Sequence, residues 1–230
     1  MTTIERLGKN TRPLAGWRRV LCVGAILAVG GTGHAGTQGP DAPVPVPQAA
    51  EREGGAGLPQ GDIEPKTAED RGKALDQLYG RLAKTHDDAE GTTIRASIRQ
   101  LWLNSGSATI DLLLERDAQA ALGHDPALRH QLLDAASKLS PETPEIWNRR
   151  AGLDYGELHF DAAMADLARV LAIEPRHFEA IEALATILRE TGRDPLALKA
   201  FRRLQAVNPT APDIQKDIDD LTRKVDGQKI

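Results

Sequence analysis

Two consecutive blocks of the chain decide its fold: PEIWNRRAGLDYGELHFDAAMADLARVLAIEPRH at residues 144–177 and FEAIEALATILRETGRDPLALKAFRRLQAVNP at residues 178–209. Their bulky, small and proline positions coincide when one block is shifted by 34 residues along the other. A repeat of this length is typical of a helical hairpin. The matching pairs are Trp147 and Ile181, Ala151 and Ala185, Ala163 and Ala197, Leu167 and Phe201, Ile173 and Val207, and Pro175 and Pro209.

The same register extends upstream, where a third and more degenerate unit covers residues 107–143. Its apolar and proline positions precede their counterparts in the next block by the same 34 residues. The sequence therefore predicts an array of stacked units followed by an open end. The positions that match are Leu113 with Trp147, Leu133 with Leu167, Ala136 with Val170, Leu139 with Ile173, and Pro141 with Pro175.

Turn residues indicate where these helices begin and end. Asp125 followed by Pro126 predicts a helix with Asp125 as its N-cap and Pro126 at its first position. Asp194 and Pro195 repeat this arrangement, one residue out of register, in the last block. Proline also closes a helix, because it lacks an N–H group and restricts the residue before it. Helix ends are therefore predicted at Ser140-Pro141, Glu174-Pro175 and Asn208-Pro209, and a helix start at Thr143-Pro144.

The small residues of the two clear blocks have a packing reason. Ala151 and Ala163, and likewise Ala185 and Ala197, allow two helix backbones to approach closely while larger side chains fill the adjoining grooves. We expect a bulky replacement at one of them to overpack the hairpin at a cost of about 1–3 kcal/mol.

Amphipathic helices flank the array on both sides. Residues 67–106 predict a helical hairpin, which is either a cap or a further repeat, because apolar residues recur at helical spacing in two successive segments. Residues 210–230 predict a capping helix and tail with one apolar and one charged face. The apolar positions are Leu75, Leu78, Tyr79 and Leu82, then Ile94, Ile98, Leu101 and Trp102, and finally Ile214, Ile218, Leu221 and Val225.

Residues 110–209, and most specifically 144–209, resemble the tetratricopeptide-repeat (TPR) family. The sequence departs from the family pattern at Arg150 and Asp154, where members usually carry large apolar or aromatic groups. The resemblance implies an all-α fold, a short right-handed superhelical solenoid of antiparallel helix hairpins. The first helices of the hairpins would line a concave groove for a peptide, an extended segment or a partner helix. The residues that carry the resemblance are Trp147, Ala151, Phe160, Ala163 and Leu167, then Ile181, Ala185, Ala197 and Phe201, with the closing prolines.

The resemblance also assigns a groove-facing side to the first helices. Family members that bind chaperone tails grip a terminal carboxylate with lysines, an arginine and asparagines, and this set is absent because Asn148, Gly152, Glu182 and Thr186 stand at the corresponding places. Mixed charge instead indicates a partner segment of complementary charge, bound with salt-sensitive affinity. The alternative is an ordinary solvated helix face. The candidate groove residues are Glu145, Asn148, Arg149, Tyr155, Glu179, Glu182, Thr186 and Arg189.

The N-terminus predicts a signal peptide over residues 1–35. Basic residues precede an apolar run from Val20 to Val29, and small residues follow up to Ala35, after which cleavage is expected. This run is short for a membrane helix, which needs about 20 apolar residues, so an uncleaved inner-membrane anchor is the alternative. Residues 36–66 are rich in Pro, Gly and Ala and predict a disordered linker.

Composition and charge exclude several classes of site. Without residues 1–35 the chain keeps 24 of its 29 basic and 32 of its 33 acidic side chains, which gives a net charge of about −8. An acidic chain lacks the basic stripe that nucleic-acid binding requires. Its single cysteine, Cys22, falls in the apolar run, so neither a disulfide framework nor a cysteine metal site is expected.

No arrangement of residues in the sequence predicts catalysis or a cofactor. The histidines are scattered, and neither His124 with His130 nor His159 with Asp161 has the spacing and third ligand of a zinc site. A glycine-rich phosphate loop and a nucleophile constellation are absent as well. The aromatic residues at helical spacing are expected to form core.

The sequence thus favours a non-enzymatic scaffold of the bacterial periplasm that binds a protein or peptide through the repeats. It predicts neither the partner's identity nor the oligomeric state. One alternative is a membrane-anchored accessory subunit of an envelope assembly, which requires an uncleaved N-terminus. Another is an enzyme with a pocket between the N-terminal hairpin and the repeats.

Overall fold

A computed structural model describes residues 67–227 of the chain. Within this range the chain forms nine α-helices and no strand, which confirms the all-α prediction. None of these helices is long and apolar enough to cross a lipid bilayer. The predicted signal peptide and linker lie outside the described residues. The helices are α1 (Ala68–Leu82), α2 (Asp88–Leu103), α3 (Ala108–Leu122), α4 (Pro126–Leu139), α5 (Pro144–Gly156), α6 (Phe160–Ile173), α7 (Phe178–Glu190), α8 (Asp194–Val207) and α9 (Ile214–Gly227).

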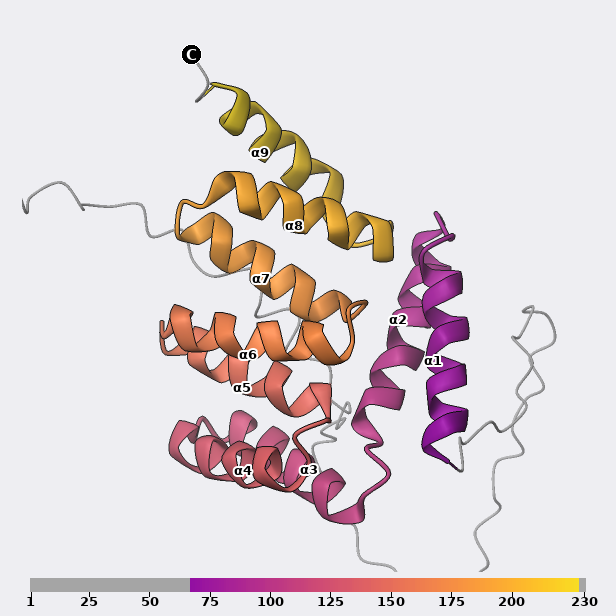
Figure 1. The fold of residues 1–230 in the computed structure, drawn as a ribbon, viewed down its shortest axis with the longest axis vertical. Coiled ribbons are helices and arrows are strands. Elements are labelled where there is room, and N and C mark those ends of the chain that lie inside the picture. Colours follow the sequence, from indigo (N-terminus) through magenta and orange to yellow (C-terminus); the bar gives the residue numbers. More distant parts are fainter. Residues whose placement is uncertain (1–66, 228–230) are drawn as a thin grey trace, which may run out of the picture. The chain divides into compact units, whose positions relative to one another are not determined.

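The repeated sequence forms stacked hairpins. The pairs α3–α4, α5–α6 and α7–α8 follow one another in chain order, and α9 packs on α8 (Figure 1). Ala151, Ala163, Ala185 and Ala197 are all fully buried, so the two backbones of a hairpin approach closely at these positions. The array of antiparallel hairpins predicted from the 34-residue register is confirmed.

Local sequence explains most helix starts. Asp125 caps α4, because its carboxylate accepts a hydrogen bond from the backbone N–H of Leu128 at 2.9 Å. The matching prediction for Asp194 is wrong, since α8 begins at Asp194 itself. Its buried carboxylate instead accepts from the Lys224 ammonium of α9 at 2.9 Å. A charged partner on the capping helix therefore replaces the local capping bond.

The capping helix α9 covers the last hairpin as its apolar pattern predicts. Ile214, Ile218 and Leu221 are buried, and the opposite face is exposed to solvent. Arg189 of α7 donates to the carboxylate of Asp217 at 2.6 Å. Together with the contact between α8 and α9, this ion pair fixes α9 against both helices of the hairpin.

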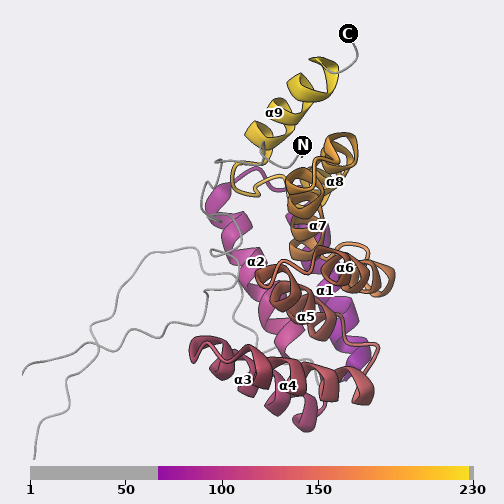
Figure 2. The same cartoon turned by 90° about the vertical axis from the view of Figure 1, so that its left-hand side faces the viewer.

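The N-terminal hairpin α1–α2 does not extend the stack. It runs across the ends of the stacked helices and packs against α7 and the turn after α8 (Figures 1 and 2). The Trp102 ring stacks on His177 with ring centroids 3.8 Å apart. Arg95 donates to the Thr210 carbonyl at 3.0 Å and to the Asn208 side chain at 3.1 Å. The hairpin therefore joins two successive turns between repeats.

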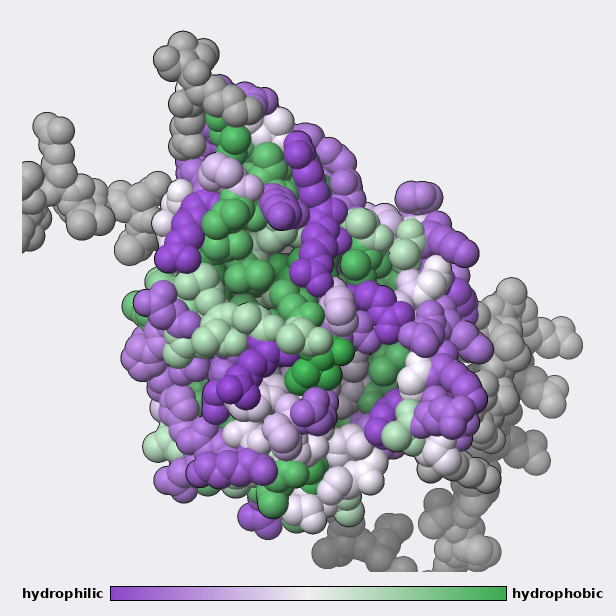
Figure 3. All heavy atoms as spheres, viewed as in Figure 1, coloured by the Kyte–Doolittle hydropathy of each residue, from purple (hydrophilic) through white to green (hydrophobic). Residues whose placement is uncertain are grey.

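The apolar interior includes two separate clusters. One joins α1 and α2 with α7, α8 and α9 and contains Phe178 and Phe201. The other lies within α3, α4 and α5 and contains Leu133 and Ile146. On the face shown in Figure 3, hydrophobic residues gather over α7 and α8. Charged side chains of α5 and α7 lie between the two clusters.

Candidate functional site

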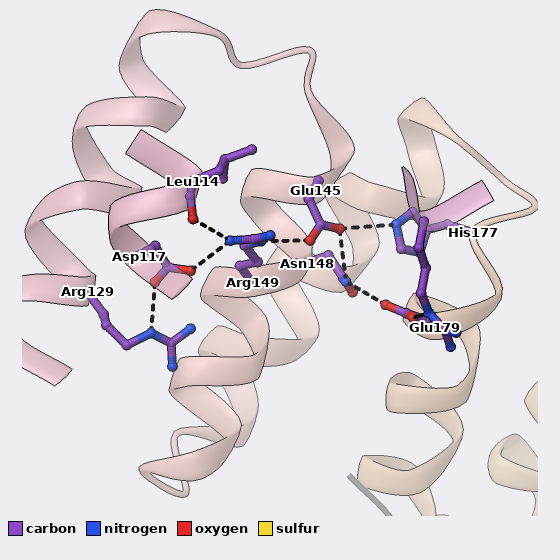
Figure 4. A network of polar contacts seen from close by, with 9 residues as sticks. Leu114, Asp117, Arg129, Glu145, Asn148, Arg149, His177 and Glu179 are labelled. Atoms are coloured by element: carbon purple, nitrogen blue, oxygen red, sulfur yellow. Dashed lines mark hydrogen bonds and ion pairs between the residues drawn. The ribbon is translucent and has the colours of Figure 1, made fainter. Parts of the chain in front are cut away.

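A continuous chain of polar contacts runs from α4 to α2 through the first turns of α5 and α7 (Figure 4). It includes four of the eight residues that the sequence assigned to the groove. The groove residues in it are Glu145, Asn148, Arg149 and Glu179, and the others are Arg99, Asp117, Arg129 and His177.

The first half of this network surrounds Arg149. Its guanidinium donates to Glu145 at 2.7 Å, to the Leu114 carbonyl at 2.7 Å and to Asp117 at 3.3 Å. Asp117 is 1% exposed and also accepts from Arg129 at 2.8 Å. Each buried charge thus has an opposite charge within hydrogen-bond distance, as charges in a protein interior require. Arg149 connects α5 to α3 and is largely buried.

The second half connects α5 to α7 and to the N-terminal hairpin. The Asn148 amide lies 3.4 Å from carboxylate oxygens of both Glu145 and Glu179. Glu179 also accepts from Arg99 of α2 at 2.5 Å. Arg99 comes from outside the repeats, so the cationic partner of Glu179 belongs to the N-terminal hairpin.

Burial raises the pKa of several carboxyl groups on α7 and α9, although arginines lie near them. Burial and the Glu145 carboxylate raise the pKa of Glu179 to about 7, although Arg99 acts in the opposite direction. Burial also raises the pKa of Glu182 and of Asp217 above their ordinary values. A raised carboxyl pKa means that the site disfavours the ionised form. Burial is the largest cause of the raised pKa in all three groups.

His177 marks the boundary between the hairpin and the repeats. Its Nδ1 accepts from the N–H of Ala180 at 3.2 Å and its ring lies on Trp102, so it is fully buried. Burial lowers the pKa of His177 to about 3, and the ring is neutral at physiological pH. Its Nε2 lies 3.9 Å from a Glu145 oxygen. His177 is a structural residue of this junction.

The other four candidates differ in how much of their side chain a partner could reach. The buried Tyr155 donates to Glu190 at 2.9 Å, and Arg189 pairs with Asp217. Glu182 and Thr186 are half-buried on α7, one turn apart, and neither side chain forms a hydrogen bond within residues 67–227. Glu182 and Thr186 are thus the candidates best placed to meet a partner, and the binding role of all eight stays a prediction.

Similarity to a curated protein shows the family to which this chain belongs. A TPR repeat-containing protein of Rhizobium etli is 38% identical to this chain over 156 residues, which cover 67% of this chain and 76% of the relative. The chain belongs to the tetratricopeptide-repeat family. No family model matches the sequence. As a TPR protein it is, in general terms, a scaffold for protein–protein interaction, and the family is generally non-enzymatic.

In TPR terms α3, α5 and α7 are the first helices of three repeats, and they share an acidic position. Asp111, Glu145 and Glu179 stand at successive 34-residue intervals near the start of these helices. Asp111 accepts from Ser105, Glu145 from Arg149, and Glu179 from Arg99. The 34-residue recurrence of the acidic position can be read from the sequence. The hydrogen-bond partners of the three acids cannot, because they come from different elements and lie at different sequence separations from the acids.

Two cavities of the TPR protein bear on the enzyme alternative. One, of about 370 Å³, is lined by α4, α5 and α6. Another, of about 590 Å³, lies in the α1–α2 hairpin. Neither cavity is shared by the hairpin and the repeats, where the enzyme alternative required its pocket.

Proposed function

We propose that the protein is a non-enzymatic periplasmic scaffold whose first-helix surface binds a basic segment of a partner protein. The observation that carries this proposal is the group of partly buried carboxylates on α7 and α9 whose pKa burial raises, with Glu182 as the one that lacks a hydrogen bond within residues 67–227. A lysine or arginine of the partner would favour the ionised form of Glu182 and offset its desolvation.

The same surface accounts for selectivity. Arg99 and Arg189 already contact Glu179 and Asp217, so an acidic segment would meet no unpaired cation there. Attraction between a half-buried carboxylate and a partner cation is modest and screened by salt. We expect affinity in the range of transient complexes, falling as ionic strength rises.

Glu182 is a better position for testing this idea than the arginines of the surface. Replacing Arg149 or Arg189 would remove the arginine that pairs with Glu145 or Asp217 and would loosen the fold. Glu182→Gln removes only the charge, and Thr186→Arg places a cation one turn further along α7. The matched control is Glu142→Gln, because Glu142 is exposed in the turn before α5.

The experiment is a crosslinking pull-down from the native host with wild-type protein and these three variants at low and high salt. We expect Glu182→Gln and Thr186→Arg to lose partners that Glu142→Gln retains, and high salt to remove them from every variant. Equal recovery with all variants at both salt concentrations would reject this surface as the binding site.

The periplasmic location rests on the N-terminal sequence. Basic residues, an apolar run and small residues up to Ala35 support export followed by cleavage. The competing function is an accessory subunit held in the inner membrane by the uncleaved segment. Mass spectrometry of the native protein separates the two, because cleavage leaves Gly36 as the first residue and the anchored form keeps the preceding 35.

A further inference from the structure

Two histidines and two carboxylates meet where α4 lies beside the turn between α5 and α6. His130 comes from α4, Asp154 from the last turn of α5, and Glu157 and His159 from the turn itself. None of the four is among the eight groove candidates, although Asp154 directly precedes Tyr155 on α5. Leu158 adopts a left-handed backbone conformation with φ 64°, which brings the two residues on either side of it to the same side of the turn.

The distances among His130, Asp154 and Glu157 fit a single metal ion, and His159 lies beside two of these three residues. His130 Nε2 lies 2.9 Å from a Glu157 oxygen, and His159 Nδ1 lies 3.5 Å from the same oxygen and 3.9 Å from an Asp154 oxygen. The ligand atoms of His130, Asp154 and Glu157 all lie within 4.8 Å of one another. Ligands held at 2.0–2.1 Å from a tetrahedral zinc ion are about 3.4 Å apart, which falls inside this range.

The neighbouring repeat shows that the fold does not require these residues. One period of 34 residues later the same four positions hold Met164, Leu188, Thr191 and Arg193. Leu188 is 7% exposed and belongs to the apolar core, and the Arg193 guanidinium contacts the Met164 sulfur at 3.6 Å. Asp154 is equally buried, at 8% exposed. A carboxylate at a core position is costly unless a cation or hydrogen bonds compensate it.

A solvent-accessible path leads to the group. His130 and Asp154 line the cavity of about 370 Å³ between α4, α5 and α6. The other charged residues of its wall are Asp134, Arg150 and Asp166. Arg150 is the single guanidinium of this wall, and it donates to both Asp166 and Asp134. Its charge is therefore shared, and the cavity has an excess of negative charge that favours a divalent cation.

We propose that His130, Asp154, Glu157 and His159 form a binding site for a divalent transition-metal ion, with Zn²⁺ as the best fit. Imidazole and carboxylate ligands in equal number suit zinc and its neighbours in the periodic table, whereas Mg²⁺ and Ca²⁺ prefer oxygen alone. A bound ion would join α4 to the α5–α6 turn and so fix two successive repeats relative to one another.

The test is titration of the metal-free full chain with Co²⁺, followed by visible absorption, and with Zn²⁺, followed by calorimetry. The variants are His130→Ala, His159→Ala and Asp154→Asn. The matched control is His86→Ala, because His86 is exposed in the turn between α1 and α2. Circular dichroism of each variant without metal checks that it is folded.

We expect wild type and His86→Ala to bind one ion in this site and to melt at a higher temperature when Zn²⁺ is present. Each of the other three variants should bind at least about tenfold more weakly, since even outer partners of metal ligands contribute that much. Binding that is equal in wild type and in folded His130→Ala, or no binding to either, would overturn the site and leave the cluster as an ion-paired contact.

Discussion

The contacts between successive repeats differ in kind, although the repeats share one backbone. Where α3–α4 meets α5–α6, which we term the first joint, Arg150 of α5 donates to Asp134 of α4 at 3.2 Å. The same guanidinium forms a bidentate ion pair with Asp166 of its own hairpin at 2.6 and 2.7 Å. Where α5–α6 meets α7–α8, the second joint, the same two positions hold Leu184 and Ala200, and both pack on the apolar core.

The comparison separates what specifies the fold from what gives each repeat its own chemistry. Buried alanines and turn prolines recur in both repeats and fix the hairpin. The joint positions accept either apolar or charged side chains, because a buried ion pair contributes little net stability compared with an apolar pair of similar volume. A polar joint therefore indicates a requirement other than stability, and the proposed metal site supplies one.

Introducing the charge of the first joint into the second should have the largest effect. Leu188→Asp removes an apolar side chain that is 7% exposed and buries a carboxylate among aliphatic groups. We expect a loss of about 4 kcal/mol in the free energy of unfolding, measured by urea denaturation. Leu196→Asp is the control, because Leu196 is 54% exposed and should change stability by less than about 0.5 kcal/mol. Similar losses for both variants would contradict the apolar character of the second joint.

Breaking the ion pair of the first joint comes next. Asp166→Ala leaves the partly buried Arg150 without its bidentate partner, and we expect a loss of about 3 kcal/mol in the free energy of unfolding. Adding Arg150→Leu should restore most of it, because the double variant reproduces the Leu184 and Ala200 pair of the second joint. Asp134→Ala should cost less than about 1 kcal/mol, since the Asp134 side chain is 53% exposed. A double variant no more stable than Asp166→Ala would show that the joints are not interchangeable.

Changing the pH should test the polar contact of Glu179 with Asn148, which crosses the second joint beside its apolar contacts. Glu179 has a folded pKa of about 7 against a reference value of 4.5, so the folded state binds more protons between these pH values. Its contribution to stability is complete below pH 4.5 and is lost as the pH rises through about 7. We expect Glu179→Gln to be less sensitive than wild type over this window by about 2 kcal/mol in urea denaturation. Glu142→Gln, at an exposed position, should follow the wild-type curve.

The smallest expected change in stability comes from replacing the proposed metal ligand Asp154 with the leucine found at the same position of the next repeat. Asp154→Leu gives the first joint the residue of the second, and we expect a gain of about 1 kcal/mol in the metal-free protein, because a buried charge is replaced by an apolar group. The same variant should lose the Co²⁺ absorption. Calorimetric unfolding with and without Zn²⁺ checks both statements. A variant less stable than metal-free wild type would mean that Asp154 has a structural partner.

The sequence predicted the parts of this molecule that depend on local or periodic information. The hairpin boundaries, the buried alanines and the Asp125 cap follow from spacing and turn chemistry. The partners of the charged residues do not. Asp194 binds Lys224 instead of capping its helix, and Glu179 pairs with Arg99 from a segment outside the repeats.

The proposed metal site also depends on contacts between residues that are distant in the sequence. His130 and His159 are 29 residues apart, a separation that matches no metal motif, and only the stacking of one hairpin on the next brings their surroundings together. The departures from the family pattern at Arg150 and Asp154 were visible in the sequence. Their meaning required the structure, because it depends on which residues of the preceding repeat face them.

The position of the N-terminal hairpin also has a consequence for how the chain unfolds. Stacked repeats ordinarily contact only their neighbours, so their ends can fray one at a time. Here Arg95 hydrogen-bonds to Thr210 across a sequence separation of 115 residues, and Gly91 lies so near Thr210 that a Cβ at this position would collide with the Thr210 hydroxyl. Fraying of the last repeat must therefore break the hairpin's contacts as well, which makes unfolding cooperative. During synthesis, the hairpin emerges first and must wait for residue 210 before it can dock.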